Sequence, residues 1–174
     1  MTESAIIDSS FTALIKAPID KIDIPAWVFS LPEAEYQACS SAHVSAATTK
    51  AADGRRMCIN VEVIGGSLMV QHFVEEISEK HHLVLTSTSD VFTPTGRTTI
   101  NVTWELRAKP IDASTCEFTN RVHTSPTDDL TNFLARQGIP FEQFRAMRSP
   151  ASEAHNRAET PFFAASIEHA ALRH

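Results

Sequence analysis

Residues 98–122, TTINVTWELRAKPIDASTCEFTNRV, alternate between apolar and polar side chains on both sides of a short break. One phase of this alternation contains Ile100, Val102, Trp104, Leu106, Cys116, Phe118 and Val122, together with the polar Asn120. A period of two predicts a β-hairpin with one face in water and the other face buried. The buried face carries a large Trp and an Asn, and both need a hydrogen-bond partner there.

Further segments of period two precede this hairpin and predict more strands. They cover residues 43–49, 55–63, 68–77 and 82–92, and short turn sequences separate them. Strands joined by short links pair as antiparallel neighbours. We therefore predict a meander of five or six strands, preceded by a first strand at residues 11–16 and by two short helices within residues 24–43.

The last third of the chain has helical patterns. Residues 127–138 predict a helix that ends at Gly138. A longer helix is predicted to begin with Ser149 as its N-cap and Pro150 in its first turn, and Pro161 is predicted to kink it. Its apolar face is predicted to contain Ala151, Ala154, His155, Ala158, Phe162 and Ala165.

These elements predict an α+β fold. An antiparallel sheet with one wet face needs a cover on its other face, and the long C-terminal helix is the candidate. We expect one domain over residues 1–174, a curved sheet wrapped around that helix, with residues 1–10 disordered. A curled sheet of this kind leaves space for a ligand at its open end.

Composition excludes several classes of function. A net charge of −6 argues against nucleic acid as a partner. Glycine-rich nucleotide-binding motifs are absent, so we expect no cofactor. The sequence shows no signal peptide and no apolar run long enough to span a membrane, and its three cysteines show no metal-binding spacing. We expect a cytoplasmic protein.

The order of elements resembles the helix-grip arrangement of the START-like (SRPBCC) superfamily, which includes birch-pollen-allergen-like proteins and polyketide cyclases. The resemblance is carried by the hairpin at residues 102–122 and by residues 154–173, AHNRAETPFFAASIEHAALR, and it covers most of the chain from Phe11. The helical segment at residues 127–138 and Pro161 depart from the family pattern. The resemblance implies a deep, mostly apolar cavity for a lipid-like, polyketide-like or aromatic molecule, without one shared catalytic residue.

The predicted cavity residues follow from strand and helix phase. His72 is in phase with Val70 on its strand, and Trp104 is in phase with Val102. The candidate ligand-binding residues are Val70, His72, Val102, Trp104, Phe118, Asn120, His155 and Phe162. For each the alternative is an ordinary packing role. The opposite face of the strand at residues 68–77, with Met69 and Phe73, is also apolar.

His155 and Glu159 lie one helical turn apart and project side by side. They could act as a general base with its carboxylate, and with His72 they are the catalytic candidates. With a further ligand such as His72 or Glu105 they could instead hold a divalent metal, or they could form a plain ion pair. Because no HExxH motif occurs, we expect no metal.

The sequence favours a protein that binds an apolar small molecule. The alternative is an enzyme of the cyclase, aromatase or hydrolase kind, and a third option is a regulatory module whose cavity is filled. An edge strand can pair with that of a second copy, so a homodimer is one of the alternatives.

Overall fold

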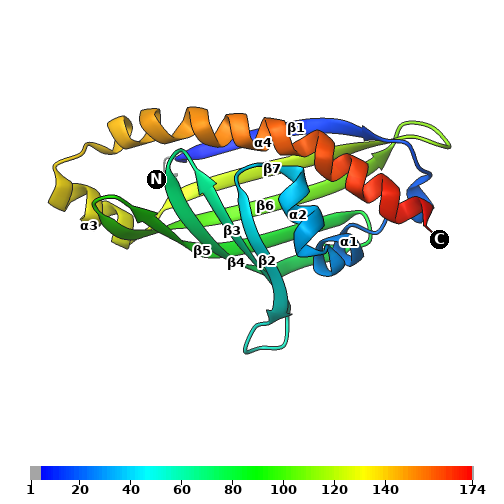
Figure 1. Cartoon of the computed structure of the whole chain (residues 1–174), viewed down its shortest axis with the longest axis horizontal. Coiled ribbons are helices and arrows are strands. Elements are labelled where there is room, and N and C mark those ends of the chain that lie inside the picture. Colours follow the sequence, from blue (N-terminus) through cyan, green and yellow to red (C-terminus); the bar gives the residue numbers. More distant parts are fainter. Residues whose placement is uncertain (1–4, 174) are drawn as a thin grey trace.

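The computed structural model describes residues 5–173 and shows one curved sheet with helices on one side of it (Figure 1). Its elements are β1 (Ile7–Ile15), the 3-10 helix η1 (Ile19–Lys21), α1 (Ile24–Ser30), α2 (Glu33–Cys39), β2 (His43–Lys50), β3 (Arg56–Ile64), β4 (Ser67–Glu79), β5 (His82–Thr93), β6 (Gly96–Pro110), β7 (Cys116–Pro126), α3 (Asp128–Gln137) and α4 (Phe141–Leu172). None of the described helices is long and apolar enough to cross a membrane.

The sheet has seven strands in the order β1-β7-β6-β5-β4-β3-β2, and every neighbouring pair is antiparallel. Strands β2 to β7 form the predicted meander of six strands. The first strand begins at Ile7, earlier than expected, and pairs with β7. The expected disorder of residues 1–10 is therefore wrong for residues 7–10, whereas residues 1–4 lie outside the described part of the chain.

The hairpin formed by β6 and β7 has the predicted buried face. Val102, Trp104 and Leu106 are buried on β6, and Phe118 and Asn120 are fully buried on β7. The two polar groups that needed partners find each other, because Trp104 Nε1 donates to Asn120 Oδ1 over 2.8 Å.

Asn120 also joins the sheet to the long helix. Its Nδ2 donates to Glu159 Oε1 and to Thr160 Oγ1 of α4, at 3.2 Å each. The buried face of the hairpin thus lies against α4, as the fold prediction required. Figure 1 shows α4 running along one side of the sheet, with α1 and α2 near its C-terminal half.

The predicted start of α4 is wrong. The helix begins at Phe141, directly after Pro140, and runs through Pro150 and Pro161. Ser149 is not an N-cap, because its hydroxyl donates to the carbonyl oxygens of Ile6 (2.8 Å) and Arg145 (2.9 Å). Ser149 and Pro150 lie inside this helix, although a Ser-Pro pair is also typical of a helix start, and the sequence prediction was misled by it.

The predicted apolar face of α4 is also largely wrong. Four of its six members, Ala154, Ala158, Phe162 and Ala165, are exposed. The helix instead buries Asn156, Glu159, Thr160, Phe163, Ala164, Ser166, Ile167 and Ala171. Half of these residues are polar and have hydrogen-bond partners across the interior, so hydrophobicity alone selected the wrong side.

We predict that Asn120→Ala lowers the free energy of unfolding by about 2–3 kcal/mol, because it leaves a buried indole N–H and a buried carboxylate oxygen without a partner. Chemical denaturation measures this change. Asn101→Ala is the matched control, since Asn101 is exposed on the same hairpin, and it should stay within about 0.5 kcal/mol of the wild type. Equal effects of the two substitutions would contradict the role assigned to Asn120.

Candidate functional site

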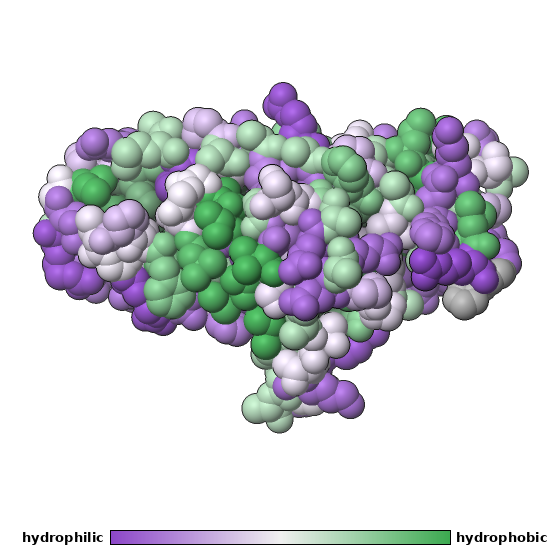
Figure 2. Space-filling view, viewed as in Figure 1, coloured by the Kyte–Doolittle hydropathy of each residue, from purple (hydrophilic) through white to green (hydrophobic). Residues whose placement is uncertain are grey.

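A cavity lies between the sheet and α4. Its internal volume is about 60 Å³, and the wider hollow around it, with open solvent included, measures about 770 Å³. The walls are mainly apolar, with Met69, Phe73, Val102, Trp104 and Phe163 among them. Figure 2 shows hydrophobic residues gathered below α4 on the part of this face nearer to α3. The structure therefore differs from the third option of the sequence analysis, a regulatory module whose cavity is filled.

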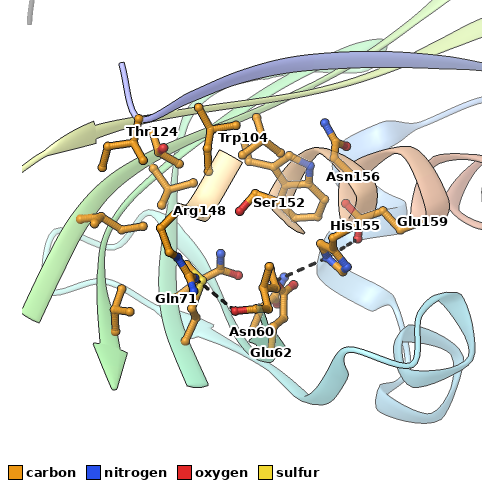
Figure 3. A pocket seen from close by; sticks show the side chains of 18 of the residues that line it. Asn60, Glu62, Gln71, Trp104, Thr124, Arg148, Ser152, His155, Asn156 and Glu159 are labelled. Carbon is orange, nitrogen blue, oxygen red and sulfur yellow. Dashed lines mark hydrogen bonds and ion pairs between the residues drawn. The ribbon is translucent and has the colours of Figure 1, made fainter. Parts of the chain in front are cut away.

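Polar side chains enter the cavity at specific points of its wall. Gln71, Thr124 and Asn156 each keep one buried side-chain oxygen without a hydrogen-bond partner within residues 5–173. Arg148 lies on the opposite side of the cavity from Glu159 (Figure 3). Its guanidinium donates to the carbonyl oxygens of Ile64 and Gly65 and to Ser67 Oγ, and burial lowers its pKa.

Two histidines and two glutamates meet at one end of the cavity. They are His43 at the start of β2, Glu62 on β3, and His155 and Glu159 one turn apart on α4. Glu62, His155 and Glu159 line the cavity, whereas the His43 side chain is fully buried behind them. One nitrogen or oxygen atom from each of the four residues lies within 4.8 Å of the other three.

The distances show how closely the four groups approach. His43 Nε2 lies 3.0 Å from Glu159 Oε2 and 3.7 Å from Glu62 Oε1. His155 Nε2 lies 3.2 Å from Glu159 Oε2 and 3.7 Å from Glu62 Oε2. Figure 3 shows His155 between the two glutamates, which come from the sheet and from the helix.

Surrounding residues hold the far atoms of this His43/Glu62/His155/Glu159 cluster. Tyr36 of α2 does so twice, since its hydroxyl donates to Glu62 Oε1 and its carbonyl oxygen accepts from His43 Nδ1 at 2.6 Å. The Tyr36 and His43 rings also stack, with centroids 3.9 Å apart. Asn120 donates to Glu159 Oε1, and Ser40 Oγ lies 3.4 Å from His155 Nδ1.

Burial and charge act in opposite directions in the cluster. Burial, together with the charge of Glu159, raises the pKa of Glu62. Burial also acts to raise the pKa of Glu159, but the hydrogen bonds from His155 and His43 outweigh it, so that pKa lies below its usual value. Burial acts to lower the pKa of His155, but the hydrogen bond and the charge of Glu159 raise it overall.

The structure brings some of the predicted site residues to the cavity. Val102, Trp104, His155 and Glu159 line it. Asn120 lies just behind the wall, where it contacts Trp104 and Glu159.

Four other predicted residues do not line the cavity. Phe118 is fully buried in the core, and 56% of Phe162 is exposed on the outer side of α4. Val70 and His72 face away from the cavity, because β4 turns Met69, Gln71 and Phe73 inward. Both faces of β4 carry apolar residues, so the sequence pattern did not decide its orientation.

Sequence reasoning did not identify His43, Glu62 or Tyr36 as site residues. For Glu62 the local pattern points the wrong way, because Met57, Ile59, Val61 and Val63 form the apolar phase of this segment. The structure instead buries the opposite phase of β3, with Cys58, Asn60 and Glu62. His43 and Tyr36 lie on separate elements, and no local spacing connects them with α4.

Comparisons with known proteins identify the fold. No protein-family model matches the chain, and no curated protein sequence matches it. Among solved structures, the Zhui aromatase/cyclase from Streptomyces sp. R1128 is similar, with a TM-score of 0.63 at 12% identity, over 95% of this chain and 93% of that one. A START superfamily protein from Mycobacterium smegmatis gives 0.55 at 14% identity, over 98% and 99%.

A third solved structure, the di-domain aromatase/cyclase StfQ of steffimycin biosynthesis, gives a TM-score of 0.59 at 10% identity and aligns with 93% of this chain and half of that one. The chain therefore has the START-like helix-grip fold, as the sequence resemblance implied. At these identities the comparisons show the fold alone.

The environment of Tyr36 gives a testable consequence. Burial and the charge of Glu62 raise the pKa of Tyr36 well above 10, and Tyr36 is the single tyrosine of the chain. We predict that tyrosinate absorbance appears in an alkaline titration only as the protein unfolds. The unfolded chain loses this proton near pH 10 and the folded chain keeps it, so stability falls as the pH rises above about 10. Tyrosinate formation near pH 10 with unchanged circular dichroism would contradict the burial of Tyr36.

Proposed function

We propose that the cavity binds a mostly apolar small molecule that carries hydroxyl groups. The observation behind this proposal is an apolar cavity with a few polar atoms converging on it, an arrangement typical of small-molecule sites. Trp104, Phe73 and Phe163 offer aromatic surfaces to a flat ligand.

The polar side chains on the wall determine which ligands suit the cavity. Gln71 and Asn156 each present an amide oxygen without a partner, and such oxygens accept hydrogen bonds. A ligand hydroxyl that donates to one of them removes an unmet buried acceptor, which a pure hydrocarbon cannot do. The narrow interior favours one or two fused rings over a long lipid chain.

The binding proposal predicts that 2-naphthol raises the melting temperature more than naphthalene does. A ligand at 100 times its Kd adds about 2.7 kcal/mol to stability. Val122→Phe narrows the cavity and should abolish the shift measured against its own ligand-free form. Val63→Phe is the matched control on the outward face of β3 and should keep the shift. The binding proposal would be contradicted if neither compound shifted the melting temperature, or if the shift in Val122→Phe equalled that of the wild type.

A second candidate function is supported by the His/Glu cluster on the cavity wall. In a cyclase-type reaction the imidazole of His155, which lines the cavity, would take a proton from a methylene carbon between two carbonyl groups. The resulting carbanion would attack a second carbonyl carbon of the same chain, and its oxygen would take up a proton. This C–C bond closes the ring, and loss of the new hydroxyl together with the remaining proton of the methylene carbon, as water, leaves a double bond in it.

The cyclase candidate predicts that the protein converts a linear poly-β-keto thioester into a ring product that is one water lighter. Mass spectrometry measures this product. His155→Gln should reduce its rate by about 100-fold or more, because general acid–base catalysis contributes about 10²–10⁴. His72→Gln, outside the cavity, should leave the rate unchanged. A rate equal to that without protein would exclude this candidate.

A further inference from the structure

Nitrogen and oxygen atoms of His43, Glu62, His155 and Glu159 face one another within 4.8 Å. His43 Nδ1 lies 2.6 Å from the Tyr36 carbonyl oxygen, which can only accept, so the Nδ1 proton is fixed there. In the neutral ring the other nitrogen, Nε2, then carries a lone pair. That lone pair points at Glu159 Oε2, a carboxylate oxygen, at 3.0 Å.

The same conflict recurs around the cluster. Glu159 Oε2 is also 3.2 Å from His155 Nε2, so one oxygen faces two ring nitrogens. Glu62 Oε1 accepts from the Tyr36 hydroxyl and Glu159 Oε1 accepts from the Asn120 amide, so Glu62 Oε2 and Glu159 Oε2 are the oxygens left for a bound ion. When both histidines are neutral, these inward atoms lack a donor, and a cation between them would be their common partner.

The inner atoms have the spacing of a tetrahedral metal site. Zn²⁺ binds nitrogen and oxygen ligands at about 2.0–2.2 Å, which separates the ligands of a tetrahedron by about 3.3–3.6 Å. Glu159 Oε2 lies 3.0 Å from His43 Nε2 and 3.2 Å from His155 Nε2, and Glu62 Oε2 lies 3.7 Å from His155 Nε2. One atom from each of the four residues lies within 4.8 Å of the others. Two carboxylates also neutralise a divalent cation, so burial of the assembly costs no net charge.

The outer hydrogen bonds match those around metal ligands. A ligating His commonly donates its second ring N–H to a carbonyl oxygen, as His43 does to Tyr36, and ligating carboxylates are themselves hydrogen-bonded, as both are here. The cavity gives an ion a route in, because three of the four residues line it.

We propose that His43, Glu62, His155 and Glu159 form a binding site for a divalent transition metal, with Zn²⁺ as the fitting ion. The sequence led us to expect no metal, because it identified the pair His155 and Glu159 but not the two further ligands, His43 and Glu62, on the sheet. Metal at this place makes His155 Nε2 a ligand and removes it as a proton acceptor. The binding of an apolar molecule does not depend on it.

The test uses the full chain without a histidine tag, stripped with a chelator and titrated with Zn²⁺ alone in a calorimeter. The expected result is one Zn²⁺ per chain. Glu62→Gln and His155→Asn should each weaken binding by about 100-fold or more, whereas Tyr36→Phe should weaken it by about 10–100-fold. His82→Gln is the matched control, because His82 forms a His–Glu pair with Glu105 outside the cavity, and it should bind as the wild type does.

Two measurements on the wild type keep the test valid if a variant fails to fold. Co²⁺ should give the intense visible absorption of four-coordinate cobalt, and Zn²⁺ should shift the ring nitrogen resonances of two histidines, His43 and His155. Absence of one-to-one binding, weak six-coordinate cobalt bands, or binding that is lost only in His82→Gln would overturn the proposal. If one-to-one binding is absent, protons on the histidines, and not a metal ion, hold the cluster together. Because no organic ligand is present, failure here leaves the result with 2-naphthol unaffected.

Discussion

The hydrogen bond between Asn120 and Glu159 is the contact on which the rest of the structure depends. It joins the middle of the sheet to the middle of α4 inside the protein, where a carboxylate without partners would be strongly unfavourable. On the sheet side Asn120 is held by Trp104, and on the helix side Glu159 is held by two histidines. The helix can therefore take only a rotation and a register that bring Glu159 to this point.

That constraint explains why the interior is both hollow and polar at one end. An α4 that packed through alanines and phenylalanines alone could approach the sheet closely and fill the space. The helix instead buries Asn156, Glu159, Thr160 and Ser166, and each of them reaches a partner on another element or on its own preceding turn. The cavity lies beside this polar line, so any ligand meets an apolar wall together with Glu62 and His155.

The sequence predicted the parts of the fold that period-two alternation determines. The meander, its turns and the buried face around Trp104 follow from spacing along single strands. The sequence also showed that the indole N–H needs a partner, but it did not identify Asn120 as that partner. The face of β4 and the face of α4 could not be predicted in this way. On β4 both faces are apolar, and on α4 the buried face is half polar because its partners are distant in sequence.

The candidate site was predictable only in part for the same reason. His155 and Glu159 are one turn apart, so their proximity is local, and the sequence identified them. His43, Glu62 and Tyr36 come from three other elements and meet α4 only through the curvature of the sheet. Glu62 gave no local sign either, because the apolar Ile59, Val61 and Val63 predict that the opposite face of β3 is buried.

The most direct test of this account is a high-resolution crystal structure of the protein purified without added ligand. The account predicts Glu159 bonded to Asn120, the inner atoms of His43, Glu62, His155 and Glu159 converging on one point, and an open cavity beside them. An interior filled by the protein's own side chains, or the two carboxylates turned away from the histidines, would contradict it.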